Sequence, residues 1–145
     1  MSSKISHVEV ISNIDKAIDL KDEAVEKALI EIGELLEGEA KDEISRPKAH
    51  ADGSIRPNVD TGRLRGSITY ATKTSHSDGE EPAEPSDYAL LGSVPKGTVV
   101  VGTNVEYAAF VEMGTSRSKP YPYLKPSIQN NRETIKKILE DNLKS

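Results

Sequence analysis

The sequence of 145 residues contains no cysteine and no tryptophan, and it has a single phenylalanine. The absence of cysteine excludes disulfides, thiolate zinc sites and thiol catalysis. No apolar run is long enough to cross a bilayer as a helix. The opening residues, MSSKISHVEV, lack the continuous apolar core of a signal peptide. We therefore expect a soluble protein that is not secreted by the standard route and has no membrane partner.

Charge is plentiful and unevenly distributed. The net charge is -5, and 30% of the residues are charged while only 35% are hydrophobic, which predicts a modest core. The segment from Asp15 to Glu43 contains eleven acidic residues and four lysines, whereas the segment from Arg117 to Ser145 contains seven basic residues and three acidic ones. One interpretation is that these are solvated helix faces. The other is a surface of two signs that packs head to tail against a copy of itself, as ring subunits do.

The hydrophobic spacing predicts a long helix over 13–46. Its apolar residues recur at steps of three, four and seven, which places them on one face of a helix. Pro47 ends it, because the residue before a proline resists helical geometry. The following residues, 47–58, contain two prolines and a glycine and predict a loop.

The region 59–115 predicts a small sheet. SITYATKTS alternates as a strand does, and TVVVGT at 98–103 is rich in β-branched residues, so we expect the two to pair as an antiparallel hairpin. The polar, acidic residues 74–96 form a long and mobile hairpin loop between them. A short helix within 104–115 follows, with Gly114 as its C-terminal cap.

Pro126 can occupy the first turn of a helix, so a C-terminal helix is expected over 126–143. The fold class is then α+β, as a single domain over 1–145. Its parts are a long N-terminal helix, a small antiparallel sheet with a long hairpin loop, a short helix and a C-terminal helix.

The tripeptide Asp-Thr-Gly within VDTGRLRGSI is also the signature of aspartic proteases. There it follows an apolar strand, whereas Arg56-Pro57-Asn58 precedes it here, and a small residue usually follows it where this chain has Arg63. We favour a turn in which Asp60 accepts backbone N–H groups and Gly62 lets the chain bend. The three histidines lie in polar or terminal segments without a partner at ligand spacing. We therefore expect no enzyme activity, no metal and no cofactor.

Nucleic-acid binding is a rival interpretation. Basic residues lie beside Tyr121 and Tyr123 in RSKPYPYLK, and such mixtures can hold phosphates and stack on bases. The sequence pI of about 5.3 is below that of a dedicated binding domain. The alternative is that both tyrosines are wedges that fix the last helix against the sheet.

Three stretches in order, VDTGRLRGSI, VVVGTNVEYAAFVEMGT and PYLKP, resemble a family of minor structural proteins of tailed bacteriophages. The family is named for gene product ten of an HK-type lambdoid phage and is described as head–tail joining, neck or tail-completion proteins. The resemblance covers Val59 to Leu143. The positions that carry it are Asp60, Thr61, Gly62, Leu64, Arg65, Ser67, Ile68, Tyr107, Ala108, Val111, Glu112, Gly114, Thr115, Pro122, Leu124 and Pro126. Tyr123 stands where the family usually has phenylalanine.

The resemblance implies a connector subunit of the virion neck or tail, assembled in the bacterial host cytoplasm from a phage or prophage gene. Its partners are copies of itself in an oligomeric ring and the neighbouring head-connector and tail proteins, with passive contact with passing DNA. Its contacts lie on the acidic first helix, the loop between the strands and the basic C-terminal helix. Within this class it is alternatively a tail terminator or another minor tail protein. Outside the class the alternative is a nucleic-acid-binding accessory protein.

Glu112 lies in an otherwise apolar segment. A buried carboxylate without a partner is costly. The sequence therefore predicts an ion pair between Glu112 and Arg65.

Overall fold

The computed structural model describes residues 6–11, 22–50, 52–57, 62–88, 94–117 and 119–144. The expected first turns of the long helix, at 13–21, lie outside these residues. So does the Asp60-Thr61 pair.

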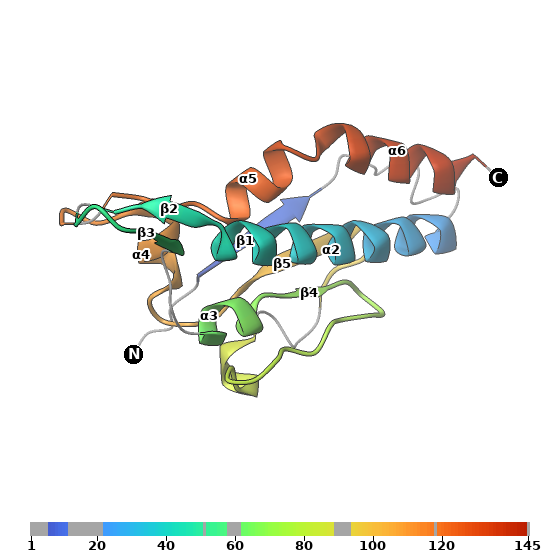
Figure 1. The fold of residues 1–145 in the computed structure, drawn as a ribbon. Helices are drawn as coiled ribbons and strands as arrows, with labels where there is room; N and C mark the ends of the chain where they lie inside the picture. The colour runs from blue at the N-terminus through green and yellow to red at the C-terminus, as the bar shows by residue number, and fades with distance from the viewer. Residues whose placement is uncertain are drawn as a thin grey trace.

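Helix α2 (Asp22–Ser45) is the central helix, and it contacts both the sheet and the C-terminal helices. Its predicted apolar stripe is buried, and the core cluster includes Val25, Leu29, Ile32, Leu36, Ala40 and Ile44. One side of α2 contacts strands β4 (Thr69–Ala71) and β5 (Thr98–Thr103). The other side contacts helices α5 (Leu124–Gln129) and α6 (Arg132–Leu143), which run beside α2 (Figure 1). Helix α5 also contacts strand β1 (Ser6–Ile11) of the sheet. The α+β class is confirmed.

A three-stranded antiparallel sheet has the order β1-β5-β4. The predicted pairing of the two strands is confirmed, with Tyr70 opposite Val101. The strand expected from SITYATKTS is shorter than predicted, because Ser67 is the last residue of helix α3 (Gly62–Ser67) and the chain turns after Ala71, where Thr72 N donates to Ser75 O. Strand β1 (Ser6–Ile11) pairs with the other edge of β5 and was not predicted. It completes the sheet with residues that lie far from their partners in sequence, from Ser6 opposite Thr103 to Ile11 opposite Thr98.

The predicted loop after α2 contains a hairpin instead. Strands β2 (Pro47–Ala49) and β3 (Ile55–Pro57) pair antiparallel, with Lys48 opposite Arg56. Proline is tolerated here because two short edge strands need few ladder hydrogen bonds. The hairpin projects past the end of α2, beside the segment that leads from helix α4 (Ala108–Met113) to α5 (Figure 1).

The residues expected to form a mobile hairpin loop are held in place along much of their length. Ser77 N donates to Tyr70 O, Glu80 N donates to Gly66 O, and Ala83 is buried. The short 3-10 helix η1 (Pro85–Asp87) follows. Tyr88 then forms a β-bridge with Thr103.

The sequence predicts one C-terminal helix over 126–143, but the structure has two, α5 and α6. Asn131 causes the break. Its side-chain amide donates to Ser127 O at 2.7 Å, and its backbone N–H bonds to Ile128 O. In a continuous helix the Ser127 carbonyl would accept the Asn131 backbone N–H. Asparagine disfavours helix interiors because its side chain competes in this way.

Candidate functional site

Glu112 connects two of the three stretches that carry the family resemblance. Helix α4 ends at Gly114, whose φ of 79° is favoured by glycine. The chain then returns so that the first residues of α5 face the Glu112 carboxylate. Glu112 Oε1 accepts the backbone N–H groups of Tyr123 and Leu124, each at 2.9 Å, and Oε2 accepts that of Lys125 at 3.0 Å. A side chain from one helix thus caps the N-terminus of another.

This cap corrects the predicted ion pair. Glu112 does need a partner, but the partner is the exposed backbone end of α5. Arg65 instead lies 3.5 Å from Glu80 Oε1, on the exposed side of α3. The sequence rule that a carboxylate in an apolar segment needs a donor was sound. The error was to expect a charged side chain as the donor, whereas three backbone N–H groups bind the Glu112 carboxylate.

Tyr123 closes the same junction. Only 1% of it is exposed, and its hydroxyl donates to Ala108 O at 3.1 Å. Burial, with the negative charge of Glu112 nearby, holds the pKa of the Tyr123 phenol well above its ordinary value. The phenol therefore stays protonated and keeps its hydrogen bond. Tyr123 is one of the two wedges expected from the sequence, and a ring this deeply buried is not available to stack on a base.

Tyr121 has a different position. Its ring stacks on His50 with centroids 5.6 Å apart, and Lys119 Nζ lies 5.7 Å from its centroid. His50 follows β2, so this stack ties the projecting hairpin to the α4–α5 segment. The two tyrosines of PYPY thus fix different parts of the fold.

Arg63 organises a second junction, which the sequence analysis missed. Its guanidinium donates to Asp87 Oδ1 at 2.7 Å and Oδ2 at 3.0 Å, and to both oxygens of Glu106 at 3.0 and 3.2 Å. It also lies 5.9 Å from the centre of the Tyr107 ring. The hydrogen bonds from Arg63 hold the pKa of the buried Asp87 carboxyl below its usual value. Nothing in the sequence pairs positions 63 and 87, which come together only when η1 folds back onto α3.

The other motif residues occupy structural positions. Leu64 is fully buried in the core, and Ser67 Oγ donates to Leu64 O while contacting the Thr103 hydroxyl. Val111 and Tyr107 are partly buried and pack against the core. Leu124 is buried at the start of α5, Pro122 and Pro126 are half-buried, and Gly62 and Thr115 are exposed.

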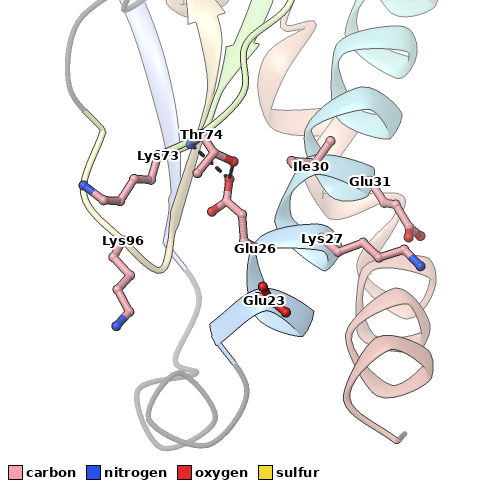
Figure 2. A pocket seen from close by; sticks show the side chains of 8 residues that line it. All are labelled: Glu23, Glu26, Lys27, Ile30, Glu31, Lys73, Thr74 and Lys96. Atoms are coloured by element: carbon pink, nitrogen blue, oxygen red, sulfur yellow. Dashed lines mark hydrogen bonds between the residues drawn. The ribbon is translucent and has the colours of Figure 1, made fainter.

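A hollow of about 620 Å³ lies at the beginning of α2. Figure 2 shows its lining, in which Glu26 reaches from the helix to Thr74 and Lys73 and Lys96 lie across from the helix. Glu26 Oε2 accepts both the backbone N–H and the hydroxyl of Thr74, so this carboxylate ties α2 to the residues after β4. Three lysines and three glutamates line the hollow, so their formal charges balance.

A groove of about 680 Å³ lies between α4 and α5. Its apolar lining comes from Met113, Pro120, Pro122 and Ile128, and Lys125 and Arg132 stand on its basic side. Met113 is 69% exposed, and Phe110 on the same helix is 61% exposed. Large apolar side chains at this exposure, grouped on one short helix, are typical of an interaction surface.

The described ranges contain no group of three or more histidine, cysteine, aspartate or glutamate side chains placed to hold a metal ion. They also contain no helix that is both long enough and apolar enough to span a membrane.

One protein family model matches the chain, over residues 9–114, and its description is "Bacteriophage HK97-gp10, putative tail-component". No curated protein and no solved structure matches. The match includes the first of the three stretches and all of the second except its last residue, Thr115. It ends before PYLKP, so the third stretch stays a predicted part of the pattern. Because the match spans well over half of the sequence, the chain belongs to the HK97-gp10-like family of bacteriophage tail components.

Proposed function

We propose that this tail component is a ring-forming structural subunit that joins the phage head to the tail, as a neck or tail-completion protein. It is assembled in the host cytoplasm and stays in the virion, where it contacts copies of itself and the adjacent connector and tail proteins. No catalytic step is part of this role.

The proposal is supported by the structural roles of the motif residues. Glu112 caps α5, Leu64 fills the core, and Ser67 bonds to the backbone and to Thr103. These contacts hold the subunit together, and of the three residues only Glu112 also borders the groove between α4 and α5. The outer surface meanwhile presents exposed apolar side chains at Ile55, Phe110 and Met113. A stable frame with apolar contact points suits a subunit of a larger assembly.

The alternative within the class is a tail terminator or another minor tail protein, which has the same fold requirements and a different position on the tail. The alternative outside the class is an accessory protein that binds nucleic acid. The burial of Tyr123 argues against base stacking at PYPY, although Arg117, Lys119 and Lys125 are exposed and could meet phosphates. Such contact would weaken steeply with added salt.

The test is a lysate of the source phage or prophage that lacks this gene, imaged by negative-stain electron microscopy before and after addition of the purified protein. Separate filled heads and tails that join on addition support the joining role. Heads joined to tails of abnormal length support the terminator alternative. Normal infectious particles without the gene refute a structural role, and salt-sensitive DNA binding by the purified protein then favours the accessory role.

A further inference from the structure

Two surfaces of this chain carry opposite charge. The first is the acidic segment, residues 74–88, which belongs to a run from 74 to 95 with five acids and no lysine or arginine. The second is the basic groove between α4 and α5. Apart from Glu112, its lining residues come from the run 113–132, which has four basic residues and no acid.

The charges on both surfaces are available to a partner. In the acidic segment Asp87 is buried against Arg63, and Glu80 lies near Lys41 and Arg65. Asp78 and Glu81 are exposed, and neither is in an ion pair of the described residues.

On the groove side, the side chains of Lys125 and Arg132 are likewise exposed and outside every ion pair of the part of the chain that is described. Glu112 also lines the groove, but its carboxylate points at the N-terminus of α5, where three backbone N–H groups offset part of its charge, and Lys125 and Arg132 together outnumber it.

The two surfaces lie on opposite sides of the molecule. Figure 1 shows η1 and the residues before it on the other side of α2 from α5 and α6. One molecule therefore cannot bring its own acidic segment to its own groove. A contact between different surfaces of two identical subunits is heterologous, and repeating it with a closing rotation gives a ring.

We propose that the basic groove of one subunit receives the acidic segment of the next copy of this chain. Asp78 and Glu81 lie against Lys125 and Arg132, and the exposed Pro82 packs on the floor formed by Met113, Pro120 and Ile128. Opposite charges set the register of such a contact, while the apolar floor supplies the buried area. This inference rests on the proposed ring and names the surfaces that form it.

The absence of cysteine makes the contact directly testable, because the only thiols in the chain are then the ones introduced. A phage carrying Glu81→Cys and Lys125→Cys in one copy of the gene is grown, its particles are purified, and a short bismaleimide is added. A head-to-tail contact gives a ladder of cross-linked oligomers on a denaturing gel. The control carries Glu81→Cys with Lys137→Cys, because Lys137 is an exposed basic residue on α6 outside the groove. It should stay largely monomeric.

Reversing the charges on the two surfaces tests the same contact without a cross-linking reagent. Lys125→Glu with Arg132→Glu places like charges in contact and should lower the incorporation of the protein into particles by about tenfold or more. Adding Asp78→Lys and Glu81→Lys to that chain restores opposite charges at every interface and should restore incorporation. Equal incorporation of all these variants would overturn the proposed contact.

The outcomes separate the two proposals. Joined particles that contain the Glu81→Cys, Lys125→Cys protein and give no more ladder than the control overturn this interface and leave the joining role intact. Particles that assemble without containing the protein at all refute the proposed function, and the interface with it.

Discussion

The junction between α4 and α5 predicts a large effect for one glutamate. Glu112 accepts three backbone N–H groups at 2.9–3.0 Å, and these groups have no partner within α5 itself. Loss of an N-terminal cap costs about 0.5–2 kcal/mol, and a hydrogen bond to a charged group contributes about 1.5–3 kcal/mol. The three bonds do not add, because water reaches part of the freed helix end. We therefore expect Glu112→Ala to lower the free energy of unfolding by about 2–4 kcal/mol.

Glu112→Gln tests the mechanism more finely. Its single amide oxygen can replace Oε1 and keep the bonds from Tyr123 and Leu124, but its NH2 group would face the N–H of Lys125, donor to donor. We expect an intermediate loss of about 1–2 kcal/mol. The control is Glu34→Ala on the exposed face of α2, which should change stability by less than about 0.5 kcal/mol.

Urea unfolding followed by far-ultraviolet circular dichroism measures all three variants, and amide hydrogen exchange at residues 123–125 reports the cap directly. Faster exchange confined to these amides is expected for Glu112→Gln. If Glu112→Ala is no less stable than the Glu34→Ala control, the cap does not hold α5, and the account of the junction is refuted.

Two further predictions follow from contacts elsewhere. Gly38→Ala should stabilise the protein by about 1 kcal/mol, because alanine favours helix and nothing lies within 4 Å of the new Cβ. Gly33→Ala should destabilise it by about 1–2 kcal/mol, because that Cβ would lie 2.6 Å from the Tyr70 ring. Thermal unfolding of the two variants tests this, and equal shifts in their Tm would contradict the packing of Gly33 on Tyr70. Asp87→Asn should lower stability at neutral pH by roughly 1–2 kcal/mol by weakening the Arg63 pair. Because that pair lowers the pKa of Asp87 in the folded state, its contribution is present above pH 3.8 and is lost as the pH falls further, so wild type and variant should converge in acid; a constant difference down to pH 2 would contradict this.

Local patterns explain what the sequence could predict. The apolar stripe of α2 depends on spacing within one helix, and the buried residues Leu29, Ile32 and Leu36 follow it. The short helix before Gly114 depends on a glycine that must adopt a positive φ. Each of these features is set by residues within a few turns of chain.

The features that the sequence could not predict depend on contacts between residues far apart in the chain. Strand β1 forms by pairing with the edge of β5. No hairpin turn joins SHVEVI to its partner strand, so the sequence gives no local sign of this pairing. The hairpin of β2 and β3 is hidden by its prolines, which are usual signs of a loop. The Arg63 network needs η1 to fold onto α3 across 24 positions. None of these contacts leaves a periodic signal in the sequence.

Glu112 shows how a motif can identify a fold without identifying a site. A glutamate between two apolar helical residues and a glycine suggests a buried charge, and a buried charge suggests catalysis or an ion pair. Here the carboxylate instead replaces the missing acceptors at the start of α5, so the spacing between Glu112 and PYLKP is the length of chain needed to bring Tyr123 back to it. The partner is then chosen by what the frame leaves exposed, which is why the acidic segment and the basic groove are where mutations should change assembly while leaving the fold intact.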